Sequence, residues 1–404
     1  MATKGSARLG SEMITIAQYL IDTAYFDEMK NLALGIGKHY VALDLVVRRV
    51  IERDFLGMGF SPYLMNLDRY TIIATLKEIP KSEQEFWGIV SSLPYNVWLR
   101  YVGIQHVPKK TLIITYTIPA RSSINSIISL LEKHPALDPK KGIDVYRFRH
   151  TFYTKPRRFS SYFNKGVLIT MTDAKDMILK ELEVKEPVEP AEFVRKRKDP
   201  IDIIDVIIMS YLEAKYLVTP VWTYRKIGAL KFHEDVLEKH FKRHIKDRYY
   251  LGVYLKRPPN PEIVNTILVA IISGRDALGL AYRLSRTPYA AATCDRGKRN
   301  KCFLQFFCRE EDLPVVTEIL NTYNIDIEKY IFTFQRTDSP NFHNRRTLSF
   351  ATYDESSKRW FGLDEAVEMA PRIAPKIIKK YFKPERIPKE LIPVYIQHIQ
   401  EELK

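Results

Sequence analysis

Apolar positions recur with a helical period at the start of the second half of the chain. Residues 201–214 place their apolar side chains on one face, and Asp199-Pro200 before them supplies an N-capping carboxylate and a first-turn proline. Thr219-Pro220 repeats this signal and predicts a second helix toward Leu230. A third helix is expected over 233–247. Its apolar stripe consists of Val236, Leu237, Phe241 and Ile245.

A strand is expected directly after these helices. Residues 249–254, Tyr-Tyr-Leu-Gly-Val-Tyr, are rich in types that favour strands. Three short helices followed by such a strand is the order of a winged helix-turn-helix, whose third helix lies in the major groove of DNA. Residues 220–257 contain ten Lys or Arg and four Asp or Glu. This unit therefore has the charge expected of a DNA-reading head.

The first half of the chain repeats the second at a displacement near 195 residues. The matched stretches are Leu56-Gly57 with Leu251-Gly252, Thr71–Leu76 with Thr266–Ile271, and Leu93-Pro94-Tyr95 with Thr287-Pro288-Tyr289. Three matches in order indicate duplication of a unit. The first copy is expected to form helices over 13–25, 26–34 and 38–53. Its third helix is apolar over most of its circumference, which predicts burial on most sides and weaker DNA binding.

Beyond each predicted wing the pattern changes to strand, helix, strand, strand, helix, strand. The first copy is expected at 70–79, 82–92, 95–104, 111–118, 121–134 and 143–150. The second is expected at 264–272, 275–286, 289–295, 301–308, 311–323 and 329–336. This is the ferredoxin-like order. The predicted fold class is therefore α+β, with two winged helix-turn-helix domains alternating with two ferredoxin-like βαββαβ domains in a pseudo-symmetric duplication.

These patterns predict six segments. They are a first winged helix-turn-helix (1–66), a first ferredoxin-like module (67–150), an extension with a basic linker (151–198), a second winged helix-turn-helix (199–260), a second ferredoxin-like module (261–336) and a C-terminal extension with helices (337–404). Each half also carries an arginine pair after its module, Arg157-Arg158 and Arg345-Arg346.

The order of the two modules resembles the leucine-responsive regulator and AsnC family of bacterial and archaeal transcription regulators. The likeness is clearest over 233–262, where Val236, Phe241 and Ile245 resemble the family's recognition helix and Leu251-Gly-Val-Tyr254 the strand after it. The resemblance implies a sequence-specific double-stranded DNA-binding regulator, here fused into a pseudo-dimer. It also implies a small-molecule effector, whose identity the sequence does not give. The chain is expected to be a monomeric pseudo-dimer or a homodimer.

The predicted DNA contacts lie on the two third helices. The second copy contributes Lys239, Lys242, Arg243 and Lys246, with His240 and His244 on the same polar side, and the first copy contributes Arg48, Arg49 and Arg53. Because arginine can bind guanine with two hydrogen bonds, Arg243 is the best candidate for reading a base. Two alternatives remain open: a replication initiator or chromatin-organising protein, and a metabolite- or protein-binding module without DNA binding.

Other candidate chemistry is weaker. His233, His240 and His244 share a helical stripe, but no carboxylate or Cys motif in the sequence completes a metal site, so a phosphate-facing surface is favoured and no metal is expected. The three cysteines, Cys294, Cys302 and Cys308, are interpreted as core thiols. Because no catalytic or dinucleotide motif appears, we expect a protein that is not an enzyme, with no catalytic residue and no cofactor.

Composition and charge agree with an anionic partner. The 404 residues include 63 Lys or Arg against 48 Asp or Glu, a formal net charge of +15. Residues 147–159 interleave arginines with aromatics, which is typical of single-stranded nucleic acid platforms and also of a final strand with exposed arginines. Apolar runs are too short for a membrane span. We expect a cytoplasmic, nucleoid-associated protein, and the paucity of glutamine suggests a thermophilic source.

Overall fold

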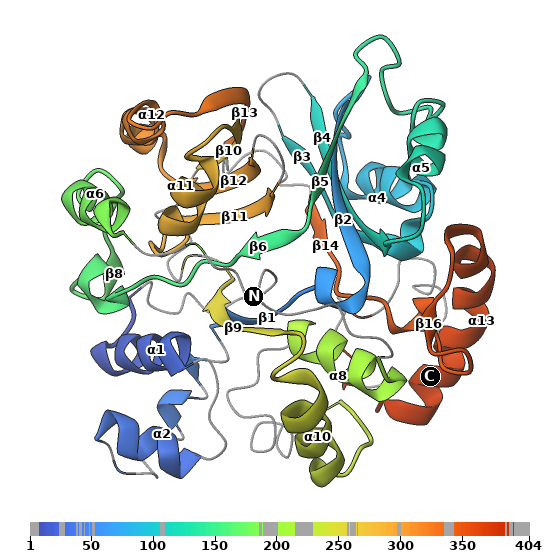
Figure 1. Ribbon diagram of the computed structural model, residues 1–404, viewed down its shortest axis with the longest axis horizontal. Helices are drawn as coiled ribbons and strands as arrows, with labels where there is room; N and C mark the ends of the chain where they lie inside the picture. Colours follow the sequence, from blue (N-terminus) through green and yellow to red (C-terminus); the bar gives the residue numbers. More distant parts are fainter. Residues whose placement is uncertain are drawn as a thin grey trace.

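Two five-stranded antiparallel sheets form the centre of the α+β structure of this chain (Figure 1). The computed structural model describes the chain except for residues 1–7, 24–28, 38, 40–42, 44, 48, 51–52, 106–109, 186–187, 189–200, 215–228, 257, 259–263, 265, 297–299, 335–342, 384–385, 388–390 and 392–404. Each sheet is built mainly from one half of the sequence. The elements of both follow the predicted order, with ends within a few residues of the predicted ones.

The first sheet has the strand order β14-β3-β4-β2-β5. Its elements along the chain are β2 (Leu67–Thr75), α4 (Glu83–Ser92), β3 (Leu99–Gln105), β4 (Thr111–Pro119), α5 (Ile124–Leu131) and β5 (Ile143–Phe148). Helix α4 begins where the sequence Ser82-x-x-Glu85 forms a cap, because the Ser82 hydroxyl accepts from the Glu85 amide at 3.1 Å. Helices α4 and α5 lie on the same side of this sheet in Figure 1.

The second sheet has the order β13-β10-β12-β11-β6. Its elements are β10 (Thr266–Ser273), α11 (Ala277–Leu284), β11 (Ala290–Asp295), β12 (Lys301–Cys308), η6 (Glu310–Asp312), α12 (Leu313–Asn321) and β13 (Asp326–Phe334). The sheet packs on α11 and α12, and α6 (Lys175–Glu183) covers the same core. Its strand β12 alternates strictly between buried and half-buried positions, as expected of a strand with one covered face.

Each sheet has one edge strand that comes from the other half of the chain. Strand β6 (His150–Phe152) follows the first module but pairs with β11 of the second sheet, with His150 opposite Cys294. Strand β14 (His343–Arg345) follows the second module but pairs with β3 of the first sheet, with Arg345 opposite Tyr101. This reciprocal exchange brings both post-module segments to the middle of the molecule.

The two sheets pack against each other within the chain. Ile73, Ile113 and Phe148 of the first sheet share a buried cluster with Val269 and Ile271 of the second. The Phe148 and Phe303 rings meet edge to face at 6.0 Å between centroids. Burial of these apolar side chains stabilises the contact by roughly 25 cal/mol per Å² removed from water.

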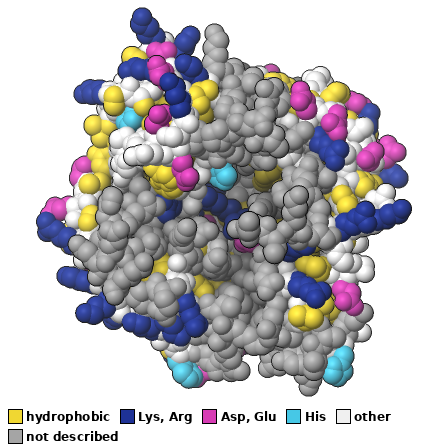
Figure 2. Space-filling model, turned by 180° about the vertical axis from the view of Figure 1, so that it is seen from behind, with side chains coloured by type: hydrophobic (Ala, Val, Ile, Leu, Met, Phe, Trp, Pro, Cys, Tyr) yellow, Lys and Arg dark blue, Asp and Glu magenta, His cyan; other side chains and the backbone are white. Residues whose placement is uncertain are grey.

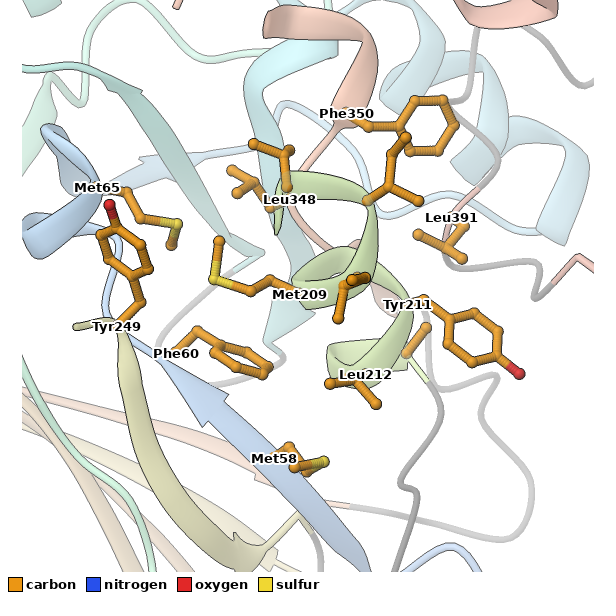
Figure 3. Close-up of a cluster of buried hydrophobic side chains, with 14 of the residues drawn as sticks. Met58, Phe60, Met65, Met209, Tyr211, Leu212, Tyr249, Leu348, Phe350 and Leu391 are labelled. Atoms are coloured by element: carbon orange, nitrogen blue, oxygen red, sulfur yellow. The ribbon is translucent and has the colours of Figure 1, made fainter. Parts of the chain in front are cut away.

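The two predicted wings pair with each other rather than projecting separately. Strand β1 (Leu56–Phe60) runs antiparallel to β9 (Tyr250–Leu255), with Gly59 opposite Gly252. Helix α8 (Ile203–Ala214) packs on this ribbon, and Figure 3 shows Met209 and Leu212 of α8 among side chains such as Phe60 and Phe350. Nearly all of α8 is buried, because its apolar residues cover most of its circumference.

The first unit begins with α1 (Ser11–Thr23) and α2 (Met29–Ile36), close to their predicted positions. The predicted third helix is helical at the described positions between 43 and 50. Our expectation that it is buried on most sides is wrong, because Leu45 is 56% exposed. Leu43, Val47 and Val50 are buried, which indicates that one stripe of the helix packs and the other does not.

The third helix of the second unit is divided. Helix α10 (Glu234–His240) passes into the π-helical turn η4 (Phe241–Ile245), where the Lys246 amide donates to the Phe241 carbonyl at 2.8 Å. Phe241 and Ile245 are fully buried, so the change of winding keeps both apolar anchors in the core. The helix predicted after Thr219-Pro220 lies outside the described residues, as does the basic linker 195–198.

The remaining elements cover the edges. They are η1 (Tyr63–Met65), η2 (Asn96–Trp98), η3 (Phe159–Tyr162), β7 (Phe163–Asn164), β8 (Val167–Leu168), η7 (Phe350–Thr352), β15 (Tyr353–Asp354), β16 (Arg359–Trp360) and α13 (Leu363–Tyr381). In the part of the chain that the structure describes, no helix has the length and apolarity that a membrane span requires.

Two of the three cysteines depart from the expectation of core thiols. Cys294 and Cys302 face each other across β11 and β12 and form a disulfide, whereas Cys308 is a buried free thiol. Sequence spacing gave no sign of this pair, because the two residues become neighbours only through the register of the two strands.

Candidate functional site

Three arginines from three separate strands meet near the crossing strands. Arg69 lies on β2, Arg100 on β3 and Arg345 on β14. Arg100 is buried, and its Nη2 donates to Oε1 of Glu213 on α8 at 2.6 Å. Burial lowers the pKa of Arg100, Glu213 opposes that shift and Arg69 adds to it, so the two arginines lie within electrostatic reach of each other. The Arg69 Nη1 donates to the neutral Thr151 hydroxyl at 2.9 Å.

Two tyrosines complete what we call the central arginine–tyrosine cluster: Arg69, Arg100, Arg345, Tyr153, Tyr254 and Glu213. Nη2 of Arg345 donates to the Tyr254 hydroxyl at 2.8 Å, and the Tyr254 ring stacks on Tyr153 at 4.2 Å between centroids. The attraction of Tyr254, followed by that of Glu213 and Tyr153, raises the pKa of Arg345 against the opposing effect of burial. Burial raises the pKa of Tyr153, so its phenol is protonated at neutral pH.

Glycines on β1 make room for both rings. A Cβ atom on Gly59 would lie 2.4 Å from the Tyr153 ring, and one on Gly57 would lie 2.8 Å from the Tyr254 ring. Both distances are far below van der Waals contact, so only residues without a side chain let the tyrosines rest on this strand. The sequence Leu-Gly-Met-Gly-Phe of β1 is thus explained by the cluster that it supports.

The cluster is accessible to solvent although protein surrounds it. Arg345 is exposed and Tyr153 half-buried, yet desolvation by neighbouring protein acts on both. Figure 2 shows a hollow near the middle of the molecule, in which Lys or Arg side chains are visible. Solvent therefore reaches Arg345 and part of Tyr153, whereas Arg100 is buried.

Positive charge exceeds negative charge in the cluster. Glu213 is the one carboxylate that the described part of the chain brings into hydrogen-bond contact with Arg69, Arg100 or Arg345. Its second oxygen accepts from the Leu348 amide at 3.1 Å. Enclosed charges of one sign are costly unless a counter-ion accompanies them, so this cluster is suited to an anionic ligand.

A second group of charges adjoins the cluster on β5 and β6. Arg147 pairs with buried Asp68, and Nε of Arg149 lies 3.8 Å from Oδ1 of Asp295. The pKa of the neighbouring His150 is lowered to about 4 by burial and by the nearby Arg149 and Arg296. The imidazole is therefore buried and neutral at pH 7.

The predicted DNA-contacting lysines and arginine of the second unit differ in exposure and in ion pairing. Lys239, Arg243 and Lys246 are exposed on α10 and the segment after it. Lys242 is half-buried and forms an ion pair with Glu238 one turn earlier at 2.5 Å. Three of the predicted cations thus face solvent and one is held along the helix.

The two predicted histidines, His240 and His244, face a carboxylate on α8. Nδ1 of His240 lies 2.7 Å from Oδ1 of Asp205, and Nδ1 of His244 lies 3.4 Å from Oδ2 of the same carboxylate. His233 does not join them, since it caps the N-terminus of α10 and its side chain is 72% exposed. Asp205 lies on α8, and no local sequence pattern linked it to the histidines.

Of the three DNA-contacting arginines predicted in the first copy, two lie within the described residues. Arg48 lies outside the described residues. Arg49 is exposed, and Arg53 is half-buried with its amide donating to the Arg49 carbonyl at 3.0 Å. The structure does not bring either residue to the central arginine–tyrosine cluster or to the cations of the second unit.

Sequence reasoning missed the members of the central cluster. Two signals pointed toward it: the interleaved cations and aromatics of 147–159, which include Tyr153, and the arginine pair that includes Arg345. Arg69 and Arg100 lie in strands whose patterns showed only their apolar positions. Long-range strand exchange, rather than spacing, assembles these residues.

Comparison with known proteins gives fold-level likeness only. No family model and no curated protein matches the sequence. A crystal structure of the siroheme decarboxylase NirDL covers 88% of this chain and 97% of its own, at 12% identity and a TM-score of 0.46. The same enzyme in complex with an iron-uroporphyrin III analogue covers 91% and 98%, at 10% identity and a TM-score of 0.43. A structure of PH0061 covers 35% of this chain and 92% of its own, at 12% identity and a TM-score of 0.27.

The comparison overturns the expectation that the protein is not an enzyme. The similar structures that span most of the chain are of an enzyme, siroheme decarboxylase. Our exclusion depended on the absence of contiguous catalytic motifs. A site of arginines, tyrosines and a histidine drawn from distant strands has no such motif, so its absence excludes little.

Proposed function

We propose that this chain is an enzyme that binds a flat, multiply carboxylated ligand of the tetrapyrrole class in the central arginine–tyrosine cluster and removes one of its carboxylates as CO2. The observation that carries the proposal is the charge of the cluster. Of its three guanidiniums, only that of buried Arg100 contacts a carboxylate in the described part of the chain, while half-buried Arg69 and exposed Arg345 donate to neutral hydroxyls.

The chemistry of the cluster favours carboxylate ligands. Arginine holds a carboxylate through two parallel hydrogen bonds, and such charge-assisted bonds are stronger in an enclosed site than in water. The ligand's negative charge offsets the repulsion among the three guanidiniums. Of the stacked pair, Tyr254 is buried, and half-buried Tyr153 offers aromatic surface to a planar ring system. A ligand with several carboxylates on a flat ring suits both properties.

Loss of CO2 from such a ligand requires a proton and no oxidant. The bond between the carboxylate carbon and its neighbour breaks, the bonding electrons stay on that neighbour, and a proton takes the place of CO2. Tyr153 can supply this proton once its hydroxyl turns from the Phe60 carbonyl, to which it donates at 3.3 Å, because burial keeps its phenol protonated. A proton from solvent then restores the phenol. The likeness to siroheme decarboxylase is confined to the fold, and the proposal rests on these residues.

Titration with iron-uroporphyrin III tests the proposal. Binding is followed by the absorbance of the ring, and the mass of the recovered ligand shows whether CO2 has been lost. Replacing Arg345 by Gln should weaken binding about tenfold to a hundredfold, since a hydrogen bond to a charged group contributes about 1.5–3 kcal/mol. The matched control is Arg372→Gln on α13, because that arginine is also exposed and pairs only along its own helix with Glu368.

Equal affinities of the Arg345→Gln and Arg372→Gln variants would contradict binding at the cluster. Binding that depends on Arg345 without change of mass would retain the ligand assignment and refute the reaction. Replacement of Tyr153 by Phe separates the two roles further. This change should leave affinity within about threefold and slow the reaction by on the order of a hundredfold, the usual range for a positioned proton donor.

We further infer that the chain is a duplicated winged helix-turn-helix and ferredoxin-like unit, distantly related to the leucine-responsive and AsnC-like regulators. The matching element orders of β2 to β5 and β10 to β13 support the duplication. So does the reciprocal exchange of β6 and β14. The six predicted segments stay predictions, since the buried cluster around α8 joins parts of several of them.

Double-stranded DNA is a second candidate ligand. The exposed Lys239, Arg243 and Lys246 on one helix favour it, and these are the cations that the sequence identified for groove contact. Binding of the full chain to a duplex at several salt concentrations tests it, with a slope of log affinity against log salt near −5 expected for roughly six neutralised phosphates. An affinity that does not respond to salt would refute this candidate.

A further inference from the structure

Three side chains of metal-binding type converge between α8 and the α10–η4 segment. They are Asp205, His240 and His244, and one ligand atom of each lies within 4.8 Å of the others. The two oxygens of Asp205 divide between the imidazoles, Oδ1 facing Nδ1 of His240 at 2.7 Å and Oδ2 facing Nδ1 of His244 at 3.4 Å. The carboxylate is buried, with 4% of its side chain exposed. The three groups therefore form a compact set rather than a chance encounter of surface side chains.

The local backbone explains how both histidines reach one carboxylate. His240 ends α10 and His244 lies in the π-helical turn that follows, four residues later. Phe241 and Ile245 are anchored in the core on the adjacent face, which directs the two histidines toward α8. Their rings lie 4.8 Å apart between centroids. Single π-helical turns are rare and are frequently found at functional sites.

The two carboxylate–imidazole separations are near those of a tetrahedral metal site, and the two imidazole nitrogens lie within 4.8 Å of each other. With zinc about 2.0–2.1 Å from nitrogen and about 2.0–2.2 Å from oxygen, neighbouring ligand atoms lie about 3.3 Å apart. The separation between His244 and Asp205, 3.4 Å, already fits. The 2.7 Å separation between His240 and Asp205 is that of a hydrogen bond, and it would need to lengthen by about 0.6 Å to admit the ion.

We propose that Asp205, His240 and His244 bind a divalent transition-metal ion of the zinc class. Two imidazoles and one carboxylate suit zinc and similar ions, whereas Mg²⁺ and Ca²⁺ prefer oxygen ligands. Three protein ligands leave a fourth tetrahedral position for water. His244, with 36% of its side chain exposed, lies on the side from which that water can enter.

Such an ion would connect α8 to the α10–η4 segment. Asp205 is fixed in the core of the second unit, while Lys239 and Arg243 are exposed on the segment that carries the histidines. Metal binding would stabilise this pair of helices, because the ion binds the folded state and not the separated ligands. The proposal is independent of the ligand assigned to the central arginine–tyrosine cluster.

Titration of the metal-free full-length protein with Zn²⁺ tests the site. We expect one equivalent to bind, with a rise in melting temperature. His244→Gln should lower the affinity for Zn²⁺ by on the order of a hundredfold. Residues that only orient a metal ligand lower metal affinity by about tenfold to a hundredfold when they are replaced, so this loss is at or above the upper end of that range. The matched control is His233→Gln, which removes an exposed histidine of the same helix and should bind Zn²⁺ like the unmodified protein.

Co²⁺ provides a readout that a hydrogen-bond network cannot produce. The unmodified protein should show the visible absorption of tetrahedral cobalt, and His244→Cys should keep one equivalent and gain a sulfur-to-cobalt charge-transfer band. The proposal is refuted if no stoichiometric ion binds, if His233→Gln and His244→Gln lose affinity equally, or if the Cys variant binds without that band. A melting curve of each metal-free variant shows that it is folded before titration.

Discussion

Two groups of cations occupy very different surroundings in this protein. Lys239, Arg243 and Lys246 lie exposed along one helix, where water screens each charge. Arg69, Arg100 and Arg345 come from three strands, and protein surrounds them to different extents: Arg100 is buried, Arg69 half-buried and Arg345 exposed. The group on α10 and the segment after it costs little and can serve any polyanion. Gathering three guanidiniums beside one carboxylate is costly where protein displaces water, which favours the proposed anionic ligand.

The enclosed pair of Arg100 and Glu213 should show the largest effect on stability. Replacing Glu213 by Leu leaves the buried guanidinium without its partner, and the free energy of unfolding should fall by about 3–5 kcal/mol. Urea unfolding measures this loss. The double variant Arg100→Met/Glu213→Leu should recover much of it, because no buried charge then remains unpaired. A loss below about 1 kcal/mol in the single variant would show that water solvates Arg100 after all.

Acid should destabilise the region of β6 through His150. Its folded-state pKa, about 4, lies below its ordinary value of 6.5, so the unfolded chain binds the proton more tightly. The contribution of His150 to stability is complete above pH 6.5 and is lost as the pH falls toward 4, by on the order of 3 kcal/mol. Urea unfolding from pH 7 to pH 4 should therefore give a flatter profile for His150→Gln. Parallel profiles would contradict the enclosed position of this histidine.

Gly59→Ala should disturb the cluster without removing any charge. The added methyl group would meet the Tyr153 ring, and the strain should lower stability by about 1–3 kcal/mol and weaken ligand binding. Gly88→Ala is the matched control, since a Cβ on this glycine of α4 meets no atom within 4 Å. That variant should gain about 0.5–1 kcal/mol from helix propensity. Similar losses in both variants would indicate that the Tyr153 contact matters little.

Replacement of an exposed cation should have the smallest effect. Arg243→Ala is expected to change the free energy of unfolding by less than about 0.5 kcal/mol and to leave tetrapyrrole binding unchanged. If duplex DNA also binds, the salt slope should fall by about one for a lost phosphate contact. Thermal melting and binding at several salt concentrations measure both quantities. A loss of tetrapyrrole binding would erase the distinction between the two groups of cations.

The sequence predicted the helices and strands, which depend on the local period of the apolar residues. It did not predict the contacts between segments that lie far apart in the chain. The strands and helices of both modules lie near their expected positions, because strand and helix periods are visible in their apolar residues. The exposed cations of α10 were predicted for the same reason. The exchange of β6 and β14 has no local signal, and neither has the contact of Asp205 with His240 and His244. The exposure of Leu45 was also missed, since an apolar helix in sequence does not reveal which of its faces find a partner.

The carboxylate dependence of tetrapyrrole binding tests the central claim most directly. Unmodified protein is titrated with iron-uroporphyrin III and with the same ring after its carboxylates have been converted to neutral esters. We expect the free acid to bind at least a hundredfold more tightly, since each charge-assisted hydrogen bond contributes about 1.5–3 kcal/mol, and Arg345→Gln to remove part of this preference. Equal affinity for the two forms, or a preference unaffected by Arg345, would show that the arginines of the cluster do not hold the ligand's carboxylates.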